Sequence, residues 1–120
     1  MKIKKISVRK RVEFGRRYSV YVVRLQSAIK QFDKVFNLNK NRNLDLPCVY
    51  VGMTGLDPAA RFKNHKKGYK SSGWVHKYGI ALMPALYKGL NPMTYKEAVK
   101  MEVNLAEKLR KQGYTVLGGH

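Results

Sequence analysis

The stretch from Cys48 to His65 constrains this chain most, because its residue types predict a strand, a glycine turn and a helix in immediate succession. The first residues are mostly β-branched or aromatic, which is typical of a buried strand. Two glycines then bracket a turn that demands small residues. An Asp-Pro pair follows and is a strong signal for the start of a helix. We therefore expect a strand at 48–52 and a helix from about residue 58 to 67.

This succession brings three unlike side chains to one turn. Tyr50 leaves the end of the strand, and Arg61 and His65 are spaced to share one face of the helix. The backbone N–H groups of residues 52–55 can meet an anion. Each side chain alone has an ordinary explanation, as a core aromatic, a surface contact or a surface histidine. Together, a phenol, a guanidinium and an imidazole predict a site that handles phosphate.

The charge of the chain predicts a polyanionic partner. With 25 Lys and Arg against seven acids, the net charge is +18, which favours nucleic acid over an anionic membrane surface. At 120 residues we expect one domain, 1–120. No apolar run approaches the roughly 18 residues of a membrane span, and no secretory signal is expected. The lone Cys48 favours a reducing compartment, cytoplasmic or nuclear.

The remaining segments surround this stretch. Residues 1–17 are expected as a basic N-terminal arm or an extra strand, and residues 18–25 as a central strand with helices over both faces. Residues 26–47 read as an insertion between the first two core strands, partly helical and partly a mobile loop. The strand at 48–52 should pair antiparallel with the one at 18–25.

The C-terminal half predicts two more strands and a long helix. Residues 80–87 should form a third strand, at an edge or a bulge because of Pro84. Thr94 and Glu97 form a capping box that opens a helix running to about Gln112, with Gly113 after it. A short strand is expected at 114–117.

Glu102 lies in the middle of the apolar stripe of this last helix. A carboxylate facing the core is costly unless it is paired or binds a metal. A salt bridge to a basic residue of the sheet would satisfy it. Because the chain has only seven acids, Glu102 is also the best-placed ligand if a divalent metal is required. One carboxylate with waters and a substrate phosphate is an ordinary Mg²⁺ arrangement.

The order of these residues resembles the GIY-YIG nuclease family over most of the chain, from about residue 18 to the C-terminus. The motifs that carry the resemblance are Ser19-Val20-Tyr21 for Gly-Ile-Tyr, Tyr50-Val51-Gly52 for Tyr-Ile-Gly, Arg61 with His65 four residues later, and Glu102 preceded by Ala98.

Three features depart from the family pattern. The first motif has Ser-Val in place of Gly-Ile, and residues 22–49 separate the two tyrosines where the family commonly has a short hairpin. Many members carry an Asn near the C-terminal strand, whereas no Asn follows Asn104 here. A catalytically inactive nucleic-acid-binding module of the same fold therefore stays open as an alternative, as does a small basic RNA-binding protein.

The resemblance implies an α+β fold with a small central antiparallel three-stranded sheet flanked by helices. It implies an endonuclease that hydrolyses phosphodiester bonds in DNA with one divalent ion, Mg²⁺ or Mn²⁺. Glu102 would hold the ion, and Arg61 would bind the phosphate. Tyr21 or Tyr50 would orient or deprotonate the attacking water, with assistance from His65 or a nearby cation.

Basic side chains are expected to hold the nucleic-acid backbone without reading bases. The candidates are Arg24, Lys63, Lys66, Lys67, Lys70 and Lys77. RNA remains an alternative substrate, and the oligomeric state is left open.

Overall fold

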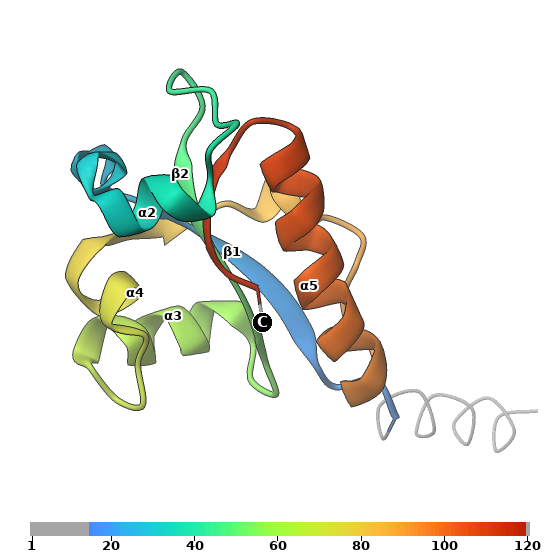
Figure 1. The fold of residues 1–120 in the computed structure, drawn as a ribbon. Coiled ribbons are helices and arrows are strands. Elements are labelled where there is room, and N and C mark those ends of the chain that lie inside the picture. The colour runs from blue at the N-terminus through green and yellow to red at the C-terminus, as the bar shows by residue number, and fades with distance from the viewer. Residues whose placement is uncertain (1–14, 120) are drawn as a thin grey trace, which may run out of the picture.

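The β-branched run early in the chain forms β1 (Ser19–Leu25), one of the two inner strands of the sheet in the computed structural model, which describes residues 15–119. β1 pairs antiparallel with β2 (Cys48–Thr54) on one side and with β3 (Gly79–Leu82) on the other. β4 (Thr115–Gly118) pairs with β2 in parallel. The sheet order is therefore β3-β1-β2-β4 (Figure 1).

The protein is thus an α+β domain with a four-stranded mixed sheet, and the expectation of a three-stranded antiparallel sheet was wrong in its strand count. The three antiparallel strands are present, and the C-terminal strand joins them at the outer edge of β2. A parallel pairing of this kind needs a long crossover, which α5 (Tyr95–Lys111) supplies. Local residue patterns mark a strand but do not say which neighbour it pairs with.

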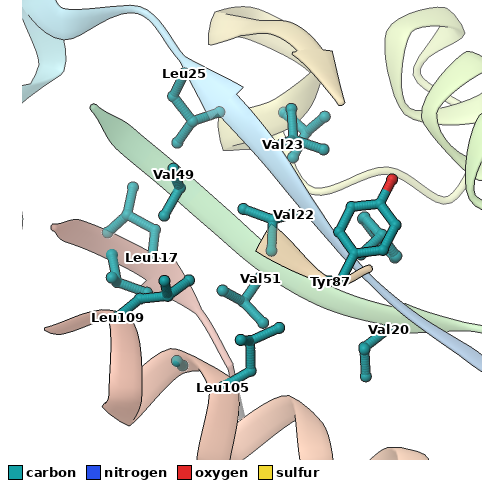
Figure 2. Close-up of a cluster of buried hydrophobic side chains, with 14 of the residues drawn as sticks. Val20, Val22, Val23, Leu25, Val49, Val51, Tyr87, Leu105, Leu109 and Leu117 are labelled. Carbon is teal, nitrogen blue, oxygen red and sulfur yellow. The ribbon is translucent and has the colours of Figure 1, made fainter. Parts of the chain in front are cut away.

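Helices cover both faces of the sheet, as predicted. α3 (Pro58–Lys67) and α4 (Gly73–Tyr78) pack against β1 and β3, whereas α5 packs against β1, β2 and β4 (Figure 1). Figure 2 shows Leu105 and Leu109 of α5 pointing toward Val51 and Leu117 in the sheet. Neighbouring residues of a strand point to opposite faces, so β1 contributes side chains to both layers.

The helix ends follow from local chemistry. Asp57 and Pro58 begin α3, and Gly68 ends it in the left-handed conformation with φ 85°. At the start of α5, the Glu97 N–H donates to the Thr94 hydroxyl at 3.1 Å, and the Thr94 N–H donates to the Glu97 carboxylate at 2.9 Å. This capping box and both predicted helix ranges are confirmed to within a residue.

The third strand is shorter than predicted. β3 ends at Leu82, and the short 3₁₀ helix η2 (Pro84–Leu86) takes up most of the remaining range. Proline has no N–H to give to a sheet, so pairing stops before Pro84. The edge position of this strand is confirmed.

The insertion at 26–47 contains the 3₁₀ helix η1 (Ser27–Gln31) and α2 (Asp33–Leu38), so its partly helical character is confirmed. The rest of the insertion was expected as a mobile loop, and several hydrogen bonds anchor residues 39–47 to the remainder of the domain. The buried Asn39 side chain donates to Val116 O at 3.0 Å and accepts from Val116 N at 2.8 Å. It thereby covers the open edge of β4, which would otherwise present unpaired backbone groups.

Two expectations concern the ends and the membrane. The basic arm at 1–17 lies almost entirely outside the described residues. Within residues 15–119, no helix has the length and apolarity needed to span a membrane.

Candidate active site

Tyr21 and His65 form the centre of the candidate site. Tyr21 comes from β1 and His65 from α3, and both side chains are almost completely buried. Tyr21 Oη lies 2.8 Å from His65 Nε2. The other ring nitrogen, Nδ1, accepts a hydrogen bond of 3.0 Å from the Ser72 backbone N–H. The imidazole is therefore held at both nitrogens.

These contacts decide which way the hydrogen bond runs. Burial, and then the charge of Arg61, lower the pKa of His65 to about 4, so the ring is neutral at pH 7. Since the Ser72 backbone N–H can only donate, Nδ1 must be the acceptor, and the single ring proton sits on Nε2. His65 therefore donates to the Tyr21 oxygen. It positions that oxygen and does not take its proton.

Gly52 makes room for the Tyr21 ring. The two residues face each other across the β1–β2 pair. A Cβ at residue 52 would lie 2.5 Å from Tyr21 Oη and 2.6 Å from Cζ, distances that packed atoms do not tolerate. The glycine of the Tyr-Val-Gly motif is thus required because a buried tyrosine crosses it.

Tyr50 lies next to this pair and is half-buried. Its ring centroid is 6.5 Å from that of Tyr21 and 6.0 Å from that of His65. Gly118, with φ +76°, lets the backbone pass close to the ring, since a Cβ there would lie 2.9 Å from Tyr50 Cε2. The three rings form a compact triangle beside the end of β4.

Arg61 holds the loop after α3 and acts on all three rings. Its guanidinium donates to Lys70 O at 2.7 Å and to Tyr69 O at 3.4 Å. Its positive charge lowers the pKa of Tyr21, Tyr50 and His65. A fixed cation thus stands beside the ring triangle.

Glu102 supplies a negative charge to the candidate site, opposite in sign to that of Arg61. It lies on α5 and is only 8% exposed, as its place in the apolar stripe predicted. Its carboxylate raises the pKa of both Tyr21 and Tyr50, so its charge reaches the ring triangle from the helix.

The tyrosines are neutral phenols at pH 7. Burial is the largest cause that raises the pKa of Tyr21, and Tyr50 adds to it, while Arg61 opposes both. Burial also raises the pKa of Tyr50, against a hydrogen bond from the Ser72 side chain. Both hydroxyls can therefore donate and accept hydrogen bonds, and neither is a ready base.

The donor chemistry at Glu102 fits a magnesium-type ion. A carboxylate oxygen is the ligand such ions prefer. Between residues 15 and 119, no group of three or more His, Cys, Asp or Glu could enclose a metal. An ion here would therefore complete its shell with water and substrate phosphate oxygens.

The structure separates the predicted basic residues. Arg24 is exposed but lies three residues from Tyr21 along β1, so it points to the opposite face of the sheet. Lys66 donates to His76 O at 3.2 Å and to Gly79 O at 2.9 Å, which ties α3 to α4. Lys77 lies over the Tyr78 ring at 5.5 Å. The other three, Lys63, Lys67 and Lys70, are exposed on α3 and just after it, and Lys70 lies over the Tyr69 ring at 5.6 Å.

Sequence reasoning missed the part played by Ser72. Ser72 is the N-cap residue of α4, but its side chain makes no capping bond. Instead its backbone N–H fixes the His65 tautomer, and its hydroxyl lowers the pKa of Tyr50. No local pattern could have indicated this, because the contacts cross from the loop to α3 and β2.

In comparisons with known proteins, no family model, no curated protein and no solved structure matches this chain.

Proposed function

We propose that this protein is an endonuclease that hydrolyses phosphodiester bonds in DNA and requires one divalent ion, Mg²⁺ or Mn²⁺. The observation that supports the proposal is the 2.8 Å contact between Tyr21 and His65 beside Tyr50, with the opposite charges of Arg61 and Glu102 both acting on the tyrosines. A phosphate-sized anion needs a fixed cation and hydroxyl donors, and a hydrolytic ion needs a carboxylate. The site has all three.

Arg61 is the phosphate clamp in this proposal. Two of its N–H groups are used on the carbonyls of the loop, which fixes the plane of the guanidinium. A guanidinium has five N–H donors, so others remain for phosphate oxygens. Its charge would offset the negative charge that grows on the phosphate during attack.

The tyrosines orient the attacking water. Tyr50 is half-buried and closest to solvent, so its hydroxyl is the one that can meet a water beside the phosphate. His65 holds the Tyr21 hydroxyl in place by donating a hydrogen bond from Nε2 to the Tyr21 oxygen. Glu102 would hold the ion, which would supply positive charge to the phosphate and lower the pKa of the attacking water.

The proposal is tested by cleavage of supercoiled plasmid and of a branched DNA in Mg²⁺, Mn²⁺ or EDTA. Glu102→Gln and Tyr50→Phe should lose at least about 100-fold in rate, the scale of losing one group that acts on the transition state. The matched controls Glu107→Gln and Tyr69→Phe change exposed residues and should keep wild-type rates.

A second readout does not depend on activity. Mn²⁺ binding measured by calorimetry in the presence of a non-cleavable DNA should disappear in Glu102→Gln and persist in Glu107→Gln. Circular dichroism would establish that each variant is folded. Tight DNA binding with no cleavage in any metal would refute the proposal and favour an inactive binding module.

A further inference from the structure

A groove begins at Tyr50 and leads away from the candidate active site. Its first hollow has a volume of about 580 Å³ and is lined by Tyr50, Ser72, Trp74, Lys34, Leu38 and Arg110, among others. A second hollow of about 330 Å³ shares Leu38 and Arg110 with the first. The two hollows therefore adjoin at these residues, and we call them together the basic groove.

The insertion at 26–47 builds one wall of the basic groove. α2 lies beside the C-terminal segment of the chain (Figure 1), and the opposite wall comes from the end of α5. This wall depends on residues that separate the two tyrosine motifs. The groove is therefore a different surface from the lysines of α3.

The charge of the basic groove is uniformly positive. Its cationic lining residues are Lys34, Lys40, Arg42, Arg110 and Lys111, and among residues 15–119 no Asp or Glu lines either hollow. Arg110 is held in place, because it donates to Asn39 Oδ1 at 3.3 Å and to Val116 O at 3.2 Å. A row of cations in a concave surface concentrates polyanions.

Aromatic side chains also line the groove. Tyr50 and Trp74 line the first hollow, and Tyr114 lines the second. Trp74 packs against Phe32 and Tyr78 at centroid distances of 6.2 and 5.9 Å, which fixes its ring. Aromatic rings in a basic groove stack on bases, and only unpaired bases have free faces. A duplex keeps its bases stacked inside and would offer the groove only phosphates.

We propose that the basic groove binds an unpaired strand of DNA and leads it to Tyr50. This inference rests on the proposed function, because it identifies the substrate of the proposed nuclease as a DNA that contains a single-stranded segment. It places strand recognition on the insertion and on Trp74.

Trp74 provides a direct test, because it is the only tryptophan in the sequence. In EDTA, where a metal-dependent enzyme cannot cut, oligothymidylate should quench its fluorescence by stacking. A hairpin duplex with the same number of phosphates should leave the fluorescence nearly unchanged. Oligouridylate of equal length forms a third arm.

Two double variants of equal charge separate the groove from general attraction. Lys34→Ala with Lys111→Ala removes two groove cations, while Lys96→Ala with Lys100→Ala removes two exposed cations elsewhere on α5. For single strands, each lost phosphate contact lowers the salt slope by about 0.7, so the groove pair should lower it by about 1.4. At 0.1 M salt this corresponds to roughly 25-fold weaker binding. The control pair should change affinity by less than about threefold.

These experiments distinguish a failure of the groove proposal from a failure of the proposed nuclease function. Selective quenching by oligothymidylate with the expected loss in the groove pair supports the groove, whether or not cleavage is ever seen. Equal losses in the two double variants, or equal quenching by the duplex, overturn it. Binding of oligouridylate with none of oligothymidylate overturns the assignment to DNA. Cleavage of DNA with no effect of the groove pair leaves the nuclease and refutes the groove.

Discussion

Replacing Gly52 with alanine tests how the candidate site is built. The new methyl group would lie 2.5 Å from Tyr21 Oη and 2.6 Å from Cζ, about 1 Å closer than carbon atoms pack. Tyr21 is only 2% exposed, so its ring cannot swing into solvent. Either the ring or β2 must shift, and the hydrogen bond to His65 must lengthen.

The magnitude follows from two opposed effects. Overpacking of this kind costs about 1–3 kcal/mol. Replacing glycine by alanine recovers about 0.4–1 kcal/mol by restricting the unfolded chain. The net destabilisation should be about 1–2 kcal/mol, or very roughly 4 °C in Tm for each kcal/mol. If the proposed function holds, cleavage should fall as well.

The assay pairs urea unfolding with NMR titration of the His65 ring. In Gly52→Ala, the pKa of His65 should rise from about 4 toward its ordinary 6.5 as the ring becomes less enclosed. The matched control is Gly73→Ala, where an added Cβ has no atom within 4 Å. That variant should be neutral or slightly more stable. An unchanged unfolding midpoint together with an unchanged His65 titration would refute the reasoning.

Two further predictions follow from buried polar groups. Because the pKa of His65 is about 4 in the folded state and about 6.5 when unfolded, the unfolded chain takes up the proton first as the pH falls. The contribution of His65 to the free energy of unfolding should be complete above pH 6.5 and decline toward pH 4, by at most about 1.4 kcal/mol per pH unit. A His65→Gln variant, measured in parallel by urea unfolding, should lack this part of the decline. Identical pH profiles of the two proteins would contradict a lowered pKa for His65. Asn39→Ala should destabilise the protein by about 2–4 kcal/mol, because it leaves the buried N–H of Val116 without its partner. The control is Asn37→Ala, at an exposed position of α2 two residues earlier. Equal effects of the two changes on the thermal midpoint would show that the β4 edge is not held by Asn39.

Much of the site was predictable because its signals are local. The Asp-Pro start of α3 and the spacing of Arg61 and His65 placed both side chains on one helix face. The apolar period of α5 indicated that Glu102 would be buried, and it is. Helix caps and periodicity depend on residues within a turn or two, so the chain itself displays them.

The sheet could be predicted only in part. The strands predicted at 18–25 and 48–52 from their β-branched residues are β1 and β2, and their antiparallel pairing was expected. β2 continues to Thr54, however, so Gly52 lies within the strand and not in the turn expected for it. The parallel pairing of β4 with β2 was not expected, because strand order depends on contacts between distant segments. The same limit concealed the anchoring of residues 39–47 by Asn39.

By itself, the sequence determined the boundaries of α3 and α5, the two central strands, the buried carboxylate and the strong positive charge. The tertiary structure alone decided the parallel pairing of the fourth strand with β2, the need for glycine at 52 beneath the Tyr21 ring, and the direction of the Tyr21–His65 hydrogen bond. The physical reason is the distance along the chain over which each kind of interaction acts. A cap or an apolar period acts between neighbours in the chain, whereas a tautomer, a close approach or a groove exists only after segments far apart in sequence have packed together.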